Sequence, residues 1–385
     1  MMKSLPLLFI LGGLSFFLVF GCKEYTAKVE SPQDPKKVGV VHASGFTIEE
    51  REQYHVLQVT SPWPETKKTF TYALVPKSKL SAIALPKDTY NAIIGTPVER
   101  IVVTSTTHIP ALESLGNVQQ LVGFPDTQYI SSPVTREQIK NGAVKELGTN
   151  ENLNTELVLE LDPEVVVGFG VSSENKAYHT IEKAGIAVMY NGDWTEQTPL
   201  GKAEWIKFFG ALFHKEKKAD SIFNSIVKEY EKVKALAQKA TERPTVLSGA
   251  LYKDVWYLPA GKSWAAQFLK DAGTVYLWKD TAGTGSLSLS LETVLTKGQY
   301  ADFWISPSQF TTYLSMKGAN PHYTQFAAYQ KQKIFTFAAT RGETGGLLYY
   351  ELAPQRPDLV LKDLVHIFHP TLLPNHRPYF FNPMQ

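Results

Sequence analysis

One long amphipathic pattern, over residues 215–240, constrains the fold of this chain more than any other feature. Apolar residues recur there at every third or fourth position, lysines and glutamates stand between them, and neither glycine nor proline interrupts the run. Pro244 follows shortly afterwards, where helices commonly end. The pattern predicts a single long helix with an apolar face of Ala219, Ile222, Phe223, Ile226, Val227, Tyr230, Val233 and Ala237.

The chain on both sides of this helix alternates short apolar runs with helical patterns, which is typical of βαβ units and a largely parallel sheet. Its 385 residues also exceed the ~250–300 over which a single core keeps growing. We therefore expect an α/β protein with a packed unit on each side of the helix and a final helix over 357–367. The expected strands are 100–105, 121–124, 164–170 and 186–190 before the long helix, and 245–250, 302–306 and 333–337 after it.

The segments before and after the long helix also share a sequence pattern. Each opens with an arginine-led apolar strand, at Arg100 and at Arg243, and each later carries the motif Glu-x-Val-Leu, at Glu156 and at Glu292. We expect two similar Rossmann-like lobes joined by one helix. Their expected bounds are 98–213 for the first lobe, 214–242 for the linking helix and 243–385 for the second lobe.

The N-terminus has the pattern of an export signal. Lys3 precedes an apolar run over 5–20, which is shorter than the ~20 residues that a spanning helix needs. The run leads to Val19-Phe20-Gly21-Cys22, which resembles the lipobox of bacterial lipoproteins, where the cysteine is lipidated. The alternative is an ordinary signal peptide with an incidental cysteine. We expect a signal peptide at 1–21, then a tether and a β-hairpin-like extension around 54–75 within 22–97.

Composition removes several classes of function. The chain has 39 Lys and Arg against 37 Asp and Glu, a near-neutral balance that disfavours nucleic acid as a partner. Its single cysteine excludes an intramolecular disulfide, a Cys-x-x-Cys redox pair and a multi-cysteine zinc site, because each needs at least two thiols. With a near-neutral net charge, we expect the protein to recognise its partners through a few specifically positioned side chains rather than through a broad electrostatic field.

About residues 98–385 resemble the class III substrate-binding proteins of ABC importers, which capture iron–siderophore complexes, haem or cobalamin. The order of several motifs, downstream of a lipobox, carries the resemblance together with the long helix. These motifs are Arg100-Ile-Val-Val-Thr-Ser, Ala111-Leu-Glu-Ser-Leu-Gly, Leu159-Glu-Leu-Asp-Pro-Glu-Val-Val-Val, Pro199-Leu-Gly-Lys-Ala-Glu-Trp-Ile-Lys, Arg356-Pro-Asp-Leu and His369-Pro.

The resemblance implies an exported, membrane-anchored lipoprotein, periplasmic or at the cell surface, with no catalysis and no cofactor. It would be a monomer that delivers a metal chelate to an ABC permease dimer with its ATPase. An iron siderophore is the expected cargo, with haem or cobalamin as alternatives. In the family, a glutamate on each lobe docks on arginines of the permease, and Glu156 and Glu292 match those positions. Each also fits an ordinary first-turn glutamate that the helix dipole stabilises.

Ligands of open parallel sheets lie beyond the carboxyl ends of the strands, so the loops there hold the candidates for a binding site. Arg341 follows the strand 333–337 and suits an anionic group, because a guanidinium pairs with a carboxylate through two bonds. His108 follows the strand 100–105 and would also reach the cleft. For each candidate the alternative is core packing or a solvated loop. The aromatic candidates are Trp194, Tyr252, Trp256, Tyr257 and Trp264.

Three other classes of function stay open on the sequence alone. An exported hydrolase is supported only by Ser225 and Lys228, which match the Ser-x-x-Lys pattern of penicillin-recognising enzymes. The pair lies inside the long helix, and the sequence lacks the other motifs of those enzymes. A zinc- or manganese-capturing protein would need three or four convergent ligands, and the 9 histidines are not spaced that way. A surface adhesion role rests on the extension alone.

Overall fold

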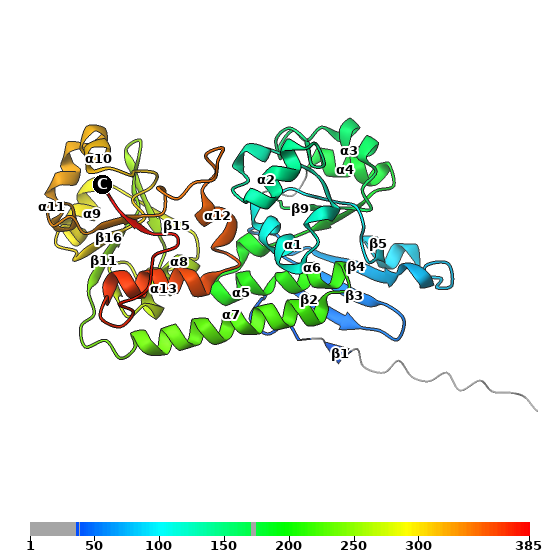
Figure 1. The fold of residues 1–385 in the computed structure, drawn as a ribbon, viewed down its shortest axis with the longest axis horizontal. Coiled ribbons are helices and arrows are strands. Elements are labelled where there is room, and N and C mark those ends of the chain that lie inside the picture. Colours follow the sequence, from blue (N-terminus) through cyan, green and yellow to red (C-terminus); the bar gives the residue numbers. More distant parts are fainter. Residues whose placement is uncertain (1–35, 38, 171–174) are drawn as a thin grey trace, which may run out of the picture. The chain divides into compact units, whose positions relative to one another are not determined.

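The computed structural model describes residues 36–37, 39–170 and 175–385, which form four sheets and the helices around them (Figure 1). Cys22 and the apolar run before it lie outside the described residues. Among the described helices, none has both the length and the apolar character needed to cross a bilayer.

The extension, residues 39–97 with the short strand before them, contains a five-stranded sheet. It has the order β1-β2-β3-β4-β5, in which only the β4–β5 pair is parallel. The predicted hairpin exists as β3 and β4, but it is the centre of a larger sheet. Phe46 and Tyr72 join the same apolar core as the first lobe, and the Tyr190 amide donates to the Tyr72 hydroxyl at 2.9 Å. The strands are β1 Lys36–Lys37, β2 Phe46–Glu50, β3 His55–Thr60, β4 Thr69–Pro76 and β5 Ala92–Thr96.

The first lobe is built on a fully parallel sheet of order β10-β9-β6-β7-β8. Alternate residues of β6 pack on opposite faces, because Ile101 and Val103 join one core cluster and Val102 another. Helices therefore cover both faces. The strands are β6 Ile101–Val103, β7 Leu121–Phe124, β8 Lys145–Glu146, β9 Val165–Gly168 and β10 Ala187–Tyr190; the helices are α1 Ile109–Leu115, α2 Pro133–Lys140, α3 Thr155–Leu161, α4 Lys176–Lys183, α5 Pro199–Glu204 and α6 Ile206–Leu212.

The second lobe repeats this plan with the order β14-β11-β16-β17-β18, in which only β18 runs antiparallel. It adds a three-stranded antiparallel sheet, β12-β13-β15. The strands are β11 Thr245–Ser248, β12 Ala250–Tyr252, β13 Val255–Pro259, β14 Val275–Tyr276, β15 Ser286–Leu289, β16 Phe303–Ile305, β17 Ile334–Thr336 and β18 Asn382–Pro383; the helices are α8 Trp264–Asp271, α9 Leu291–Gly298, α10 Tyr313–Ala319, α11 Ala327–Gln330, α12 Leu348–Leu352 and α13 Pro357–Phe368.

The predicted strand 245–250 is wrong in one respect, because it breaks at Gly249. This residue has a φ of +77°, and a Cβ there would lie 1.9 Å from the carbonyl oxygen of Tyr257. Only glycine allows the chain to turn at that point. The turn separates β11 from the hairpin β12–β13, and this hairpin carries three of the predicted aromatic residues.

The predicted long helix is α7, Glu216–Ala237, which runs unbroken between the two lobes in sequence (Figure 1). It packs against α6 of the first lobe and α13 of the second. Phe223, Tyr230 and Val233 are among its buried residues, and the Tyr230 hydroxyl donates to Asp271 of α8 at 2.7 Å. The helix therefore contributes to the cores of both lobes.

Candidate functional site

Cavities lie where the strands of the two sheets end. The first, which we call the inter-lobe cavity, has a volume of about 480 Å³. The first lobe lines it with Thr104–Thr106 after β6, Phe124–Asp126 after β7 and Phe169 after β9, and the second lobe contributes Arg341 and Tyr350. This is the position that open parallel sheets favour for ligands.

Charges of both signs line the inter-lobe cavity. Asp126 and Glu151 belong to the first lobe, and Arg341 belongs to the second. Burial, followed by the neighbouring Glu146 and Glu151, raises the pKa of Asp126. The Arg341 guanidinium donates to the carbonyl of Ala338 at 2.9 Å and to that of Gly345 at 3.2 Å. Arg341 thus stabilises its own loop while its side chain stays exposed at the cavity.

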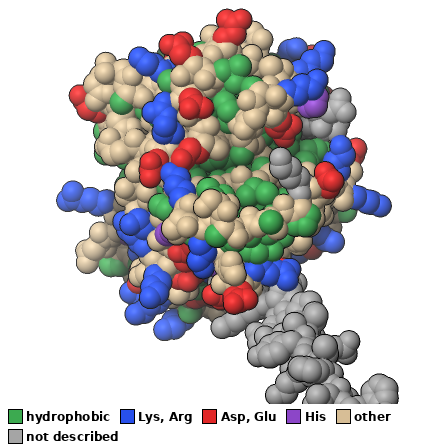
Figure 2. All heavy atoms as spheres, turned by 90° about the vertical axis from the view of Figure 1, so that its right-hand side faces the viewer, with side chains coloured by type: hydrophobic (Ala, Val, Ile, Leu, Met, Phe, Trp, Pro, Cys, Tyr) green, Lys and Arg blue, Asp and Glu red, His purple; other side chains and the backbone are tan. Residues whose placement is uncertain are grey.

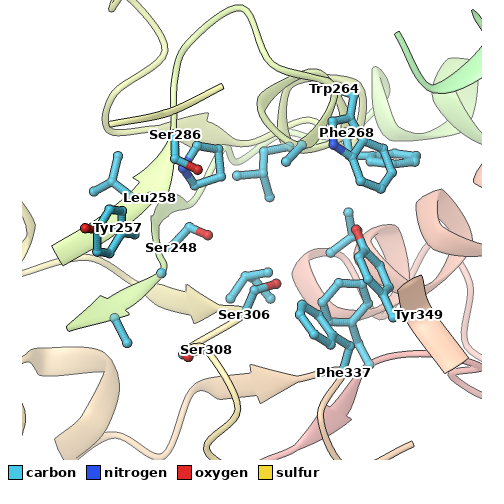
Figure 3. A pocket seen from close by; sticks show the side chains of 18 of the residues that line it. Ser248, Tyr257, Leu258, Trp264, Phe268, Ser286, Ser306, Ser308, Phe337 and Tyr349 are labelled. Carbon is cyan, nitrogen blue, oxygen red and sulfur yellow. The ribbon is translucent and has the colours of Figure 1, made fainter. Parts of the chain in front are cut away.

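An aromatic pocket of about 310 Å³ lies in the second lobe beside this cavity (Figure 3). Its aromatic wall is continuous: Phe337 stacks on Tyr349 with 4.4 Å between ring centroids and an angle of 9°, and Tyr349 stacks on Trp264 at 6.1 Å and 27°. In Figure 3, Ser248 at the end of β11 lies across the pocket from this wall, and Ser306, which follows β16, lies beside Phe337. The pocket thus offers flat rings together with serine hydroxyl groups.

The strand end that lines this pocket is conformationally strained. Ser306 has a φ of +54° and Ser308 a φ of +52°, in the left-handed region that non-glycine residues seldom adopt. Such geometry is maintained only when the surrounding structure holds it, and it gathers at functional sites. Both serines line the aromatic pocket.

A third cavity, of about 750 Å³, adjoins the aromatic pocket, and we call it the extension cavity. Pro259, Trp264 and Ser286 line both of them, and Tyr350 lines both the aromatic pocket and the inter-lobe cavity. The three neighbouring cavities are together called the cleft here.

Five of the seven predicted ligand-binding residues line this cleft. Arg341 lies in the inter-lobe cavity, Tyr252 and Tyr257 in the aromatic pocket, and Trp194 in the extension cavity. Trp264 lines both the aromatic pocket and the extension cavity. These positions agree with the hypothesis of a ligand site, and their role in binding stays a proposal.

Trp256 is a correction, because its side chain is fully buried. Side chains alternate along a strand, and in the hairpin β12–β13 Trp256 points inward while the neighbouring Tyr257 faces the pocket. The indole stacks on Trp304 at 5.3 Å and donates to the carbonyl of Ser248 at 3.0 Å. Trp256 belongs to the core beneath the site.

His108 is the second correction. It ends a short 3₁₀ helix, Thr106–His108, and this turn points its ring into the core against Phe209, 5.4 Å between ring centroids. Burial lowers the pKa of His108 to about 4. Thr104–Thr106 line the cavity instead. The ring is therefore a buried core group and does not line the cleft.

Glu156 and Glu292 occupy matching places in the two lobes. Each lies in the first turn of its helix, α3 or α9, after a capping residue whose side chain accepts a backbone N–H, Asn154 or Ser290. Both glutamates are exposed. Hydrogen bonds from its own backbone N–H and from Ser290 lower the pKa of Glu292. Each lobe thus presents a carboxylate at a helix start.

Five residues of the cleft were not predicted from the sequence: Phe337, Tyr349, Ser306 and the acidic pair Asp126 and Glu151. Asp126 follows the predicted strand 121–124, and Ser306 and Phe337 end two others, so the rule that selected Arg341 would also have selected them. Tyr349 lies on the short helix α12 and had no such signal. Among the described residues, no three His, Cys, Asp or Glu side chains converge as a metal site.

Glu351 of α12 joins the two lobes. Its buried carboxylate accepts the backbone N–H groups of Ser131 at 2.5 Å and Ser132 at 3.0 Å, at the start of α2. Burial raises the pKa of Glu351 from 4.5 to about 7. The hydrogen bond from the Ser131 N–H opposes this rise, and the nearby Glu113 carboxylate adds to it. A second contact between the lobes joins Lys140 to Glu343 at 2.9 Å.

Because the pKa of Glu351 is raised by folding, the folded protein binds the proton more tightly than the unfolded chain does. Stability should therefore fall as the pH rises from about 4.5 to about 7. Glu351→Gln should remove this part of the pH dependence in urea unfolding measured across that range. Glu343→Gln is the control, because Lys140 lowers the pKa of Glu343 and its contribution has the opposite sign. An unchanged pH slope in Glu351→Gln would contradict the assignment.

Comparison with known proteins gives matches in sequence and in fold. The family model described as periplasmic binding protein matches residues 101–340. An uncharacterized lipoprotein of Methanocaldococcus jannaschii is 25% identical over 299 residues, which cover 75% of this chain and 69% of that protein. A periplasmic haem-binding protein from Pseudomonas aeruginosa has a similar fold, with a TM-score of 0.56 and 18% identity over 75% of this chain and 98% of its own. The ABC-type Fe³⁺-hydroxamate transport system from Saccharomonospora viridis matches with a TM-score of 0.53 and 18% identity over 71% and 94%.

Proposed function

Because the chain belongs to the periplasmic binding protein family, whose members bind and deliver substrates rather than catalyse reactions, we propose that it captures a metal chelate in the cleft and delivers it to an ABC permease. The observation that carries the proposal is the aromatic wall that Phe337, Tyr349 and Trp264 form in the aromatic pocket. Flat rings together with serine hydroxyls suit a large rigid ligand with an apolar surface and a few hydrogen-bonding groups.

A ferric siderophore of low charge fits this lining better than haem does. Among the described residues that line the inter-lobe cavity and the aromatic pocket, Arg341 is the one cationic side chain. The other charged lining residues, Asp126 and Glu151, are acidic. The two carboxylates of a haem would meet a single guanidinium there, whereas a neutral hydroxamate chelate needs no counter-charge. The solved relatives include a haem binder and a hydroxamate system, so haem remains the second candidate.

Purification of the full-length protein from native membranes in detergent tests this proposal. Ferric hydroxamates, haem and corrinoids absorb visible light in different bands, so the absorption spectrum identifies the cargo that the cells supply. We expect the broad charge-transfer band of an iron chelate after growth with the chelate present. A protein that emerges colourless from cells supplied with all three kinds of ligand would contradict the proposal.

We further propose that Cys22 carries a lipid anchor, since the chain before it resembles a lipobox and a relative is named a lipoprotein. Near-neutral charge gives little attraction to anionic lipid, so the anchor would be the main membrane attachment. Cys22→Ser should move most of the exported protein from the membrane fraction to the soluble fraction after cell fractionation. Cys22→Ser protein that stays with the membrane would argue against lipidation at this residue.

The permease is the proposed docking partner of Glu156 and Glu292. One exposed carboxylate on each lobe would meet an arginine on each half of a two-fold permease, and such charge-assisted bonds set both register and orientation. The binding protein would act as a monomer in this complex.

A further inference from the structure

The extension forms part of the wall of the extension cavity, which is the largest of the three described cavities of the cleft. Thr60, Ser61 and residues 63–66, from the end of β3 and the turn after it, line one side. Trp194–Gln197 of the first lobe and Trp264 with Thr284–Ser286 of the second lobe line the others. The region that matches the family model begins at residue 101, so the part of the wall that the extension supplies lies outside that region.

Two buried carboxylates fasten the start of the extension to the first lobe. Glu204 accepts the backbone N–H groups of residues 41–43, at 3.0, 2.5 and 2.7 Å. Glu196 accepts those of Ser44 at 2.9 Å and Gly45 at 2.8 Å, together with the indole N–H of Trp205 at 3.1 Å. Five successive amides thus bind two side chains of the segment that follows Trp194, which fixes the extension beside the cavity.

The turn after β3 is fixed as well. Trp63 is buried. Its ring lies edge-on to Tyr190, with 5.1 Å between ring centroids, and is tilted against Phe70, with 5.7 Å between ring centroids. A Cβ at Gly192 would lie 3.0 Å from the Cα of Pro62, so the two segments approach closely. The wall formed by the extension is therefore a placed surface rather than a free loop.

The lining of the extension cavity differs from that of the inter-lobe cavity. None of its described lining residues is Lys, Arg or His, whereas Glu65 and Glu196 are acidic. Serine and threonine hydroxyls are numerous, and Trp194 offers a ring that is 37% exposed. Hydroxyl groups beside a tryptophan face suit a neutral, hydrogen-bonding group with an apolar side, and the carboxylates disfavour an anionic one.

We propose that the extension cavity is a subsite for an uncharged, amide- or hydroxyl-bearing arm of the chelate, so that this protein selects chelates with such an arm over compact or anionic ones. This inference rests on the proposed function, because it assigns the metal-bearing centre of the same ligand to the aromatic pocket. Trp194 and the turn after β3 act as specificity-determining elements.

Two probes test the subsite in the full-length protein. Ferrichrome is a neutral ferric trihydroxamate on a cyclic peptide, and ferric tris(acetohydroxamate) has the same iron centre without an arm. A Cβ at Gly285 meets no atom within 4 Å, so Gly285→Trp fills the extension cavity, and Gly318→Trp on α10 is its control because a Cβ there also meets none. Trp194→Ala removes the stacking ring, and Tyr300→Ala, at a tyrosine that is 82% exposed, is its control.

Gly285→Trp and Trp194→Ala should each weaken ferrichrome binding by about tenfold relative to ferric tris(acetohydroxamate), as measured by tryptophan fluorescence titration or calorimetry. The two controls should leave this ratio unchanged. Equal losses for both probes, or none for either, would overturn the subsite while the proposed function stands. If the unchanged protein binds neither probe, this result would contradict both the ferric hydroxamate cargo of the proposed function and the subsite.

Discussion

Exchange of both Glu156 and Glu292 for lysine is expected to abolish chelate uptake by cells while the purified protein keeps its affinity for the chelate. Both carboxylates are exposed and neither lines the cleft. A lysine in place of each would face the permease arginines that we propose as partners. Like charges placed together cost several kcal/mol, so docking should weaken by at least about a hundredfold.

The fold should tolerate these two substitutions. Each glutamate loses only a favourable interaction with its helix dipole at an exposed position, and the caps Asn154 and Ser290 remain in place. Glu160→Lys with Asp280→Lys is the matched control, since both positions are exposed acidic residues outside the first turns of α3 and α9 and the net charge changes equally. Uptake that survives in the Glu156→Lys/Glu292→Lys protein, or is lost equally in the control, would contradict a docking role.

Trp256→Ala is expected to lower the free energy of unfolding by ~3–5 kcal/mol, the range for large aromatic residues in cores. The indole is fully buried, stacks on Trp304 and lies edge-on to Tyr323 at 5.7 Å. Its removal leaves a cavity and an unpaired carbonyl at Ser248, which lines the aromatic pocket. Urea unfolding measures this loss directly.

The neighbouring Tyr257→Ala is the comparison for Trp256→Ala. Tyr257 is 42% exposed and lines the aromatic pocket. Its truncation should change stability by no more than ~1 kcal/mol and should weaken chelate binding instead. If Trp256→Ala proved as stable as the unchanged protein and lost affinity, the indole would belong to the cleft and its assignment to the core would be incorrect.

Periodicity was enough to predict the framework of the fold. The helix over 215–240 appears as α7, and the strands 121–124 and 186–190 appear as β7 and β10 with small shifts at most. Long apolar repeats encode such elements locally, so one sequence suffices to recognise them. The extension sheet was harder to predict, because β2 and β5 are five residues each and gain their place from β3 and β4.

The binding site was only partly predictable, for a different physical reason. The cleft lies at strand ends, and this rule predicts Arg341. Whether a side chain points into the cleft or into the core depends on where the chain turns, which the rule does not give. Gly249 starts a new hairpin, and this decides that Trp256 enters the core while Tyr257 lines the pocket. The stack of Phe337 on Tyr349 joins residues of different elements, and no local pattern announces such a contact.

Titration of the purified full-length protein with a ferric hydroxamate, haem and cobalamin shows directly whether the cleft captures a metal chelate. Trp264 and Tyr349 lie in the wall of the aromatic pocket, so a chelate bound there should quench the tryptophan fluorescence. We predict saturable quenching at one ligand per chain for the ferric hydroxamate, and a large loss of affinity in Tyr349→Ala. The absence of saturable binding for all three ligands, or binding that Tyr349→Ala leaves intact, would contradict capture of a metal chelate in this cleft.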